Sequence, residues 1–159
     1  MIEIERKFLV NTNDFKSLAT SSVFIKQAYL SKDPHRTVRI RIKNQQAFLT
    51  IKGISSTSGM SRFEWEKELT LEEGEMLFQL ALPTVIVKTR YIVPQGALSF
   101  EVDVFEGAHQ GLILAEIELM NETQKIGIPA WCGKEVTGDI NYYNAYLSER
   151  EVSKEQKKS

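Results

Sequence analysis

Charged and apolar side chains alternate along the first segment of the chain, with a repeat of two residues. Glu3, Glu5 and Lys7 fall on one side of this repeat, whereas Ile2 and Ile4 fall on the other. Because successive side chains of a β-strand point to opposite faces, the pattern predicts a strand over about residues 1–10. A single strand of this kind is typical of any sheet with one face in water.

The same alternation predicts seven further strands, separated by turn or helix signals. They cover about residues 24–31, 37–43, 47–53, 61–69, 85–92, 98–105 and 112–120. Residues 11–20 are expected to form a loop with one helical turn, and residues 44–46 a hairpin turn between the third and fourth strands.

Three helices are expected outside the strands. Thr70 and Glu73 have the spacing of a capping box, which predicts a helix that begins there and ends before Pro83. The apolar side chains that this helix is expected to bury are Leu71, Met76, Leu77, Leu80 and Leu82. A short helix is expected over residues 121–126 and a final helix over about 139–150. The residues expected on the apolar stripe of the final helix are Ile140, Tyr143 and Leu147.

Composition indicates one globular domain over residues 1–150 and a disordered, lysine-rich tail over residues 151–159. The chain is 42% hydrophobic and 26% charged, and its net charge of -1 indicates neither a nucleic-acid nor a membrane partner. We find no signal peptide and no apolar run long enough to span a membrane, so a cytoplasmic location is expected. The lone Cys132 is expected to be a small apolar side chain, and His35 and His109 to lie on the surface.

Like charges occur in pairs, two residues apart, on several of the predicted strands. The pairs are Arg39 with Arg41, Lys88 with Arg90, Glu101 with Asp103, and Glu116 with Glu118. A face that is only solvated would mix the two signs, because opposite charges on neighbouring strands attract and like charges repel. Pairs of one sign need a counter-charge from outside their strand, which favours a binding site.

Eight antiparallel strands with short connections can close a small barrel, which leaves no sheet edge exposed. The helices must bury their apolar faces against the apolar side of the strands, so we expect the helices outside and the charges inside. The predicted fold is α+β, mainly β: a closed eight-stranded antiparallel β-barrel tunnel with a charged lumen. Unpaired charges cost several kcal/mol each to bury, so the lumen should be filled with water.

The two classes of charge in this tunnel predict a site for an oligophosphate with a divalent metal. The basic residues expected in the lumen are Lys7, Arg39, Arg41, Lys52, Arg62, Lys88 and Arg90. The acidic ones are Glu3, Glu5, Glu64, Glu66, Glu101, Asp103, Glu116 and Glu118. Carboxylate oxygens suit Mg²⁺ or Mn²⁺, whereas Arg and Lys suit an anion with many oxygens. The chain has no glycine-rich phosphate loop, no His-Glu-x-x-His motif and no serine nucleophile elbow.

The order of these motifs resembles that of the CYTH or triphosphate tunnel metalloenzyme family. The family's N-terminal hallmark, Glu-x-Glu-x-Lys, is present as Glu3-Ile-Glu5-Arg-Lys7. The later motifs that match in order are Arg39-Ile-Arg41, Thr50-Ile-Lys52, Arg62 with Glu64 and Glu66, Lys88-Thr-Arg90, Glu101-Val-Asp103 and Glu116-Ile-Glu118. The resemblance covers about residues 1–147, and its C-terminal part is similar to the short bacterial members.

This resemblance implies roles for individual residues. The implied metal ligands are Glu3, Glu5, Glu116 and Glu118, with Asp103 close by. The candidates for phosphate contacts are Lys7, Arg39, Arg41, Lys52, Arg62, Lys88, Arg90 and Lys134. The candidates for catalysis are Tyr29, Glu64, Glu66 and Lys88. For Tyr29 a buried packing role is an equal alternative, because a phenol is a poor base unless cations lower its pKa.

The family resemblance implies metal-dependent work on triphosphate-bearing substrates. Similarity to the short bacterial branch favours hydrolysis of inorganic tripolyphosphate to pyrophosphate and phosphate. A class IV adenylate cyclase and a thiamine or nucleoside triphosphatase are the alternatives within the family. A non-catalytic polyphosphate- or nucleotide-binding module is the alternative of another class, although the paired glutamates would repel its anion. The expected partner is a small anionic substrate, and a homodimer is left open.

Overall fold

The computed structural model of the protein describes residues 1–148. Its strands are β1 (Ile2–Leu9), β2 (Ser21–Ser31), β3 (Thr37–Lys43), β4 (Gln46–Ser55), β5 (Ser61–Leu69), β6 (Ile86–Gln95), β7 (Leu98–Phe105) and β8 (Ile113–Glu118). Its helices are α1 (Leu71–Gln79) and α2 (Asn144–Leu147), with short 3₁₀ turns η1 (Asp14–Leu18), η2 (Gly107–His109) and η3 (Ile140–Tyr142). The predicted tail and the last two residues of the predicted final helix lie outside the described residues.

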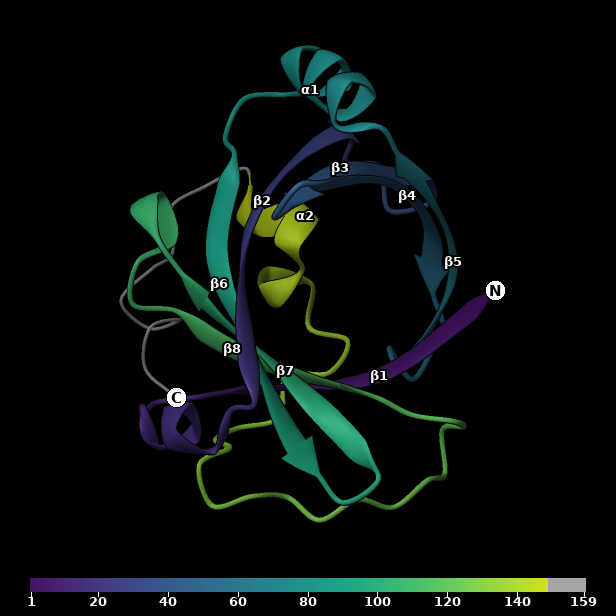
Figure 1. Cartoon of the computed structure of the whole chain (residues 1–159). Helices are drawn as coiled ribbons and strands as arrows, with labels where there is room; N and C mark the ends of the chain where they lie inside the picture. The colour runs from purple at the N-terminus through teal and green to yellow at the C-terminus, as the bar shows by residue number, and fades with distance from the viewer. Residues whose placement is uncertain (149–159) are drawn as a thin grey trace.

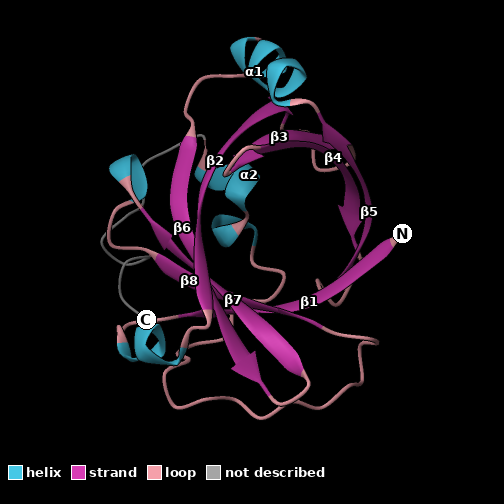
Figure 2. Ribbon diagram, viewed as in Figure 1, coloured by secondary structure: helices cyan, strands magenta, loops and turns pink. Residues whose placement is uncertain are grey.

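The eight strands form one closed antiparallel barrel, as predicted. Their order around the barrel is β1-β5-β4-β3-β2-β6-β7-β8, and β8 pairs with β1 to close the ring. Figure 1 shows this ring with α1 outside it and α2 within its outline. Figure 2 shows how little of the described chain is helical. None of the helices in residues 1–148 is long and apolar enough to cross a membrane.

Strand register decides which side chains enter the lumen. Arg39 of β3 lies opposite Thr50 of β4, which lies opposite Glu66 of β5. Residues paired in this way share one face of a sheet, so these three polar side chains all face the lumen. The neighbouring row contains Ile40, which is fully buried on the other face. As predicted, the barrel therefore has charged side chains inside and apolar side chains outside.

Aromatic packing covers the outer face of β1, β7 and β8. Phe8 and Phe100 belong to one buried cluster that also contains Trp131 and Phe15. The Trp131 ring lies 5.1 Å from that of Phe100 and 5.8 Å from that of Phe15, centroid to centroid. Phe15 comes from η1, so this short turn covers the outside of the barrel, at the position where one helical turn was expected.

Helix α1 begins with the predicted capping box, since the Thr70 side chain accepts from the Glu73 amide and the Glu73 side chain accepts from the Thr70 amide. The predicted burial of Met76, Leu80 and Leu82 is wrong, because all three are exposed. The helix rests on β4 at Gly74, where an added Cβ would lie 2.3 Å from the Ala47 Cβ. The partly buried residues Leu71, Leu77 and Phe78 share this face of the helix, so Met76 points to solvent. 

The predicted helix over residues 121–126 is wrong. This segment contains a turn in which the Asn121 side chain accepts from the Thr123 backbone amide at 3.0 Å. Asn is favoured at such turns because its side chain can bond to the backbone two residues on, in competition with helix formation.

The C-terminal segment forms η3 and α2 instead of one helix from residue 139. Tyr143 between them is extended, with φ -71° and ψ 133°, and it lines the barrel lumen. Ile140 is exposed, whereas Leu147 packs in a second core cluster with Leu9, Phe105 and Leu112. His109 is also buried there, with Nε2 hydrogen-bonded to the Leu147 carbonyl oxygen, so its predicted surface position is wrong.

Candidate functional site

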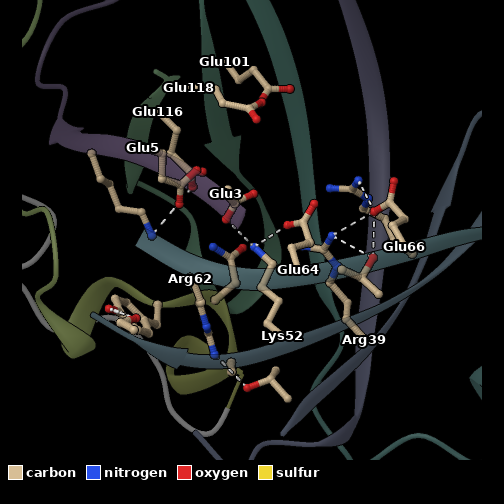
Figure 3. Close-up of a pocket in the computed structure, with 18 of the residues that line it drawn as sticks. Glu3, Glu5, Arg39, Lys52, Arg62, Glu64, Glu66, Glu101, Glu116 and Glu118 are labelled. Atoms are coloured by element: carbon tan, nitrogen blue, oxygen red, sulfur yellow. Dashed lines mark hydrogen bonds and ion pairs between the residues drawn. The ribbon is translucent and has the colours of Figure 1, made fainter. Parts of the chain in front are cut away.

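The lumen of the barrel is a polar cavity of about 240 Å³, with room for several water molecules. The predicted site residues that line it are Glu3, Glu5, Lys7, Tyr29, Arg39, Arg41, Lys52, Arg62, Glu64, Glu66, Lys88, Arg90, Glu116 and Glu118. With Glu101 of β7 added, the structure brings together residues from all eight strands. Figure 3 shows Glu5, Glu101, Glu116 and Glu118 on one side of this cavity and Arg39, Lys52 and Arg62 on another, with Glu64 and Glu66 beside these cations.

One wall of the cavity is acidic. It consists of the adjacent strands β7, β8 and β1, which contribute Glu101, Glu116, Glu118, Glu3 and Glu5. Glu5 lies directly opposite Glu118, and Glu101 lies directly opposite Glu116. Like charges at directly opposed positions of a sheet repel each other. The register therefore produces a cluster of carboxylates that a cation would stabilise.

The pKa values of the glutamates on this wall reflect their burial and the closeness of other charges. Burial, together with repulsion from Glu116 and Glu3, raises the pKa of Glu5 well above its usual value of 4.5. Burial and the nearby Glu3 and Glu101 also raise the pKa of Glu118. Although burial acts in the opposite direction, Lys7 and the hydrogen bond from Glu5 hold the pKa of Glu116 well below 4.5. The pKa values of the neighbouring Glu5 and Glu116 are thus shifted in opposite directions.

The opposite wall is basic, and two of its hydrogen-bond donors have no partner in the described part of the chain. Arg39 and Arg41 come from β3, Lys52 from β4, and Lys88 and Arg90 from β6. Burial and the neighbouring Arg39 and Arg90 lower the pKa of Arg41 to about 10. The Nε atoms of Arg39 and Arg41 are buried without a hydrogen-bond partner in the described structure. An anion with several oxygens would satisfy these donors.

Two glutamates of β5 lie among these cations. The Glu66 carboxylate accepts from Thr50 Oγ1 at 2.7 Å and lies 3.4 Å from an Arg41 nitrogen and 3.6 Å from an Arg39 nitrogen. Lys52 Nζ lies between Glu3 at 3.0 Å and Glu64 at 3.1 Å. Burial and the hydrogen bond with Glu3 raise the pKa of Glu64 to about 7. The Glu66 carboxylate therefore contacts three polar side chains, whereas the Glu64 carboxylate contacts fewer.

Asp103 neutralises two of the cations from a buried position that does not line the cavity. It is 2% exposed, lies 2.8 Å from Lys88 Nζ, and forms a two-point contact with the Arg90 guanidinium at 2.7 and 2.9 Å. Although burial acts to raise its pKa, Arg90 and Lys88 lower it. Burial lowers the pKa of Lys88 to about 8 despite the attraction of Asp103, because Arg90 also repels the ammonium.

Arg62 and Tyr29 line the cavity and also make contacts within the protein. Arg62 donates from Nε to the Gly53 carbonyl oxygen and from a terminal nitrogen to Thr37 Oγ1 at 2.9 Å. Tyr29 is 3% exposed and packs in the second core cluster, yet it also lines the cavity. Both of the roles considered for Tyr29 are thus compatible with its position.

The acidic wall fits a divalent cation in its donor chemistry. Carboxylate oxygens are the ligands that Mg²⁺ and Mn²⁺ prefer, and the opposed like charges would be neutralised by such an ion. Within residues 1–148, no group of three or more His, Cys, Asp or Glu side chains is already arranged around a common metal position. The fit therefore rests on ligand type and charge, with Glu3, Glu5, Glu116 and Glu118 as the residues that would hold the ion.

The sequence model of the CYTH domain matches residues 1–150. The chain belongs to the CYTH family. An inorganic triphosphatase of Acetivibrio thermocellus is 42% identical over 146 residues, which cover 91% of this chain and 92% of the relative. An inorganic triphosphatase of Nitrosomonas europaea is 38% identical over 154 residues, covering 93% and 97%. A solved crystal structure of an inorganic triphosphatase matches with a TM-score of 0.66 and 34% identity, covering 92% of this chain and 93% of that one.

Two of the predicted site residues, Asp103 and Lys134, do not line the cavity. Asp103 is buried in ion pairs with Lys88 and Arg90, so the structure gives it the position of a buried counter-ion. Lys134 is exposed, and its backbone pairs with Leu9 along the outer part of the CYTH barrel. We therefore leave Asp103 out of the candidate metal ligands and Lys134 out of the candidate phosphate contacts.

Several cavity residues were missed as site candidates. Thr50 is on the predicted lumen face of its strand, so the alternation could have identified it. Glu101 was placed in the lumen but not among the metal candidates. Tyr143 and Asn144 line the CYTH cavity from the C-terminal segment, and no periodicity in the sequence indicates that this segment turns toward the lumen.

Proposed function

We propose that the protein hydrolyses inorganic tripolyphosphate to pyrophosphate and phosphate, with a divalent cation as cofactor. The observation that carries this proposal is that one cavity combines an acidic wall with a basic wall on which the Nε donors of Arg39 and Arg41 have no partner among the described residues. A linear anion with many oxygens and its cation match the two walls. The two inorganic triphosphatases described above, 42% and 38% identical over most of the chain, support the same substrate.

The basic wall supplies the substrate contacts in this proposal. Arg39 and Arg41 present donors that the protein leaves unused, and Lys52 and Arg90 add positive charge around the phosphates. Lys7 and Lys88 are almost fully buried, so their charges act through a medium with little screening. These groups hold the phosphate chain and stabilise the negative charge of the transition state.

Hydrolysis requires water to attack the terminal phosphorus while the bond to the bridging oxygen breaks, so that pyrophosphate departs. The attacking water must lose a proton, and Glu64 is the better candidate to accept it because Glu66 is engaged by Thr50, Arg39 and Arg41. Tyr29 is the alternative acceptor. A cation bound by the acidic wall would neutralise phosphate charge and lower the pKa of bound water.

The proposal includes Mg²⁺ or Mn²⁺ as the cation, a small phosphate compound as the partner and a cytoplasmic location. No group in the described cavity is recognisable as a nucleobase pocket, so tripolyphosphate is preferred over ATP. A substrate panel tests this choice: tripolyphosphate, ATP and thiamine triphosphate, each with Mg²⁺ and with Mn²⁺. Release of phosphate and pyrophosphate from tripolyphosphate is the expected result. Faster formation of cyclic AMP from ATP would favour a cyclase, and binding without turnover would favour a non-catalytic module.

A further inference from the structure

Asn144, the first residue of α2, connects cavity residues that come from separate strands. Its Oδ1 accepts a hydrogen bond from Lys88 Nζ at 2.9 Å and from Gln27 Nε2 at 3.1 Å. Gln27 Nε2 also donates to the Tyr29 phenol oxygen at 3.2 Å. One amide oxygen on the C-terminal segment therefore links the ammonium of β6 to the phenol of β2.

Lys88 determines which group donates and which accepts in each hydrogen bond of this network. An ammonium group can only donate, so Asn144 must present its oxygen to Lys88. The Gln27 atom that contacts the same oxygen must then be a donor, which fixes the orientation of the Gln27 amide. Gln27 consequently donates to Tyr29 as well, and the hydroxyl hydrogen of Tyr29 stays available for an acceptor in the cavity.

Asn144 also determines where the Lys88 ammonium lies. Lys88 is 1% exposed, and its Nζ is held by Asp103 at 2.8 Å and by Asn144. An ammonium has three hydrogens, so one remains for a substrate oxygen once these two acceptors are satisfied. Without the Asn144 oxygen, Asp103 would be the remaining acceptor in this group, and it is buried and does not line the cavity.

We propose that Asn144 is a positioning residue for the bound triphosphate: its side-chain oxygen holds the Lys88 ammonium toward the lumen and, through Gln27, orients the Tyr29 hydroxyl. The inference rests on the proposed function because it deepens the description of that same site. It assigns a role in substrate binding to an uncharged residue of the C-terminal segment, which contacts the proposed phosphate-binding residue Lys88.

A double-mutant cycle on binding tests the proposal. Tripolyphosphate binding is measured by calorimetry without a divalent metal in the wild type, Asn144→Leu, Lys88→Met and the double variant. Leucine has a similar volume but no acceptor, so Asn144→Leu should weaken binding about tenfold, as expected for loss of a hydrogen bond to a charged group. In the Lys88→Met background the same change should alter binding less than about twofold, because the group that Asn144 positions is gone.

Equal effects of Asn144→Leu in both backgrounds, or no effect in either, would overturn the proposal. Thermal unfolding of each variant shows whether it is folded, and Asn144→Ala replaces Asn144→Leu in the cycle if the leucine variant is not. Asn141→Ala is the matched control, since Asn141 is an exposed residue of the same segment that does not line the cavity, and it should leave binding unchanged. Wild-type turnover is measured separately: binding without turnover would reject the proposed hydrolysis but leave the cycle decisive for Asn144, whereas absence of binding would reject both.

Discussion

Glu5 of β1 and Glu118 of β8 lie directly opposite each other, and both side chains line the cavity. Glu101 and Glu116 repeat this arrangement across the next pair of strands. Directly opposed carboxylates repel each other, so the contact within each pair does not stabilise the free barrel. Their physical role is to provide a concentrated negative charge, which is what a divalent cation requires.

Replacing one of these carboxylates should therefore separate activity from stability. Glu118→Gln should lower turnover of tripolyphosphate by about a hundredfold or more, because loss of metal charge at the phosphates costs several kcal/mol of the transition state. The free energy of unfolding should stay level or increase, since repulsion of Glu118 by Glu3 and Glu101 is removed. Steady-state kinetics at saturating Mg²⁺ and chemical denaturation measure the two effects. Glu75→Gln on the exposed surface of α1 is the control. Near wild-type turnover of Glu118→Gln would contradict the metal assignment.

The basic wall should respond differently at two of its arginines. Arg41 is surrounded by other cations, with Glu66 at 3.4 Å as its ion-pair partner. Arg41→Ala should raise the KM for tripolyphosphate about tenfold or more and leave the unfolding free energy level. Kinetics and denaturation of the same preparation test both parts. A large loss of stability would mean that Arg41 is a structural ion-pair partner.

Arg90 should be needed for stability as well as for binding. It forms a two-point contact with the buried Asp103 carboxylate. If Arg90 is removed, Asp103 keeps Lys88 as its remaining cation. Arg90→Ala should destabilise the protein by about 3 kcal/mol, because removal of one partner leaves buried charge poorly compensated. Urea denaturation of Arg90→Ala beside Arg41→Ala gives the comparison. Equal stabilities of the two variants would be inconsistent with this difference between the arginines.

The contact between α1 and β4 predicts a large effect of a single methyl group. Gly74→Ala would place a Cβ 2.3 Å from the Ala47 Cβ. It should destabilise the protein by about 1–3 kcal/mol, even though alanine is the better helix former, because the helix must move away from the sheet. Thermal denaturation measures the change. Ala47→Gly in the same chain should restore part of the loss, and a stabilised Gly74→Ala variant would show that the helix is free to shift.

The ion pair between Arg6 and Glu135 predicts a modest pH dependence of stability. The hydrogen bonds from Arg6 lower the pKa of Glu135, so the folded state holds this proton less tightly than the unfolded state. The resulting stabilisation is present above the unfolded pKa of the glutamate and is lost as pH falls through the folded one. Because both side chains are partly exposed, Glu135→Gln should cost less than about 1 kcal/mol at pH 7.

Chemical denaturation between pH 7 and pH 3 follows this difference. The gap in unfolding free energy between the wild type and Glu135→Gln should shrink as the pH falls. A gap that stays constant or widens toward pH 3 would show that Glu135 contributes through something other than its charge.

The sequence predicted the lumen residues well because strand geometry leaves little choice. A side chain at every second position must share a face, so once Arg39 is in the lumen, Arg41 is as well. The same rule cannot separate Glu101 from Asp103, which lie on one face of β7. Their difference arises from register, because Asp103 lies directly opposite Arg90. That pairing is set by the short turn between β6 and β7, and the alternation of side chains along either strand does not reveal it.

The helical regions were less predictable because tertiary contacts select among similar local patterns. Apolar spacing in α1 does not reveal that Gly74 approaches Ala47, which determines the buried face. In the C-terminal segment, the contacts of Asn144 with Lys88 and of Leu147 with His109 are made with residues far away in the chain. They favour a break at Tyr143 that the spacing of apolar residues could not indicate.

The stoichiometry of tripolyphosphate hydrolysis is the most direct test of the central claim. Purified protein is incubated with tripolyphosphate or ATP, with Mg²⁺ or Mn²⁺ and with a chelator, and phosphate, pyrophosphate and cyclic AMP are quantified. The account predicts equal amounts of phosphate and pyrophosphate from tripolyphosphate, a kcat/KM clearly above that for ATP, and no turnover with the chelator. Turnover that persists in the chelator, or cyclic AMP formation from ATP that exceeds tripolyphosphate hydrolysis, would contradict it.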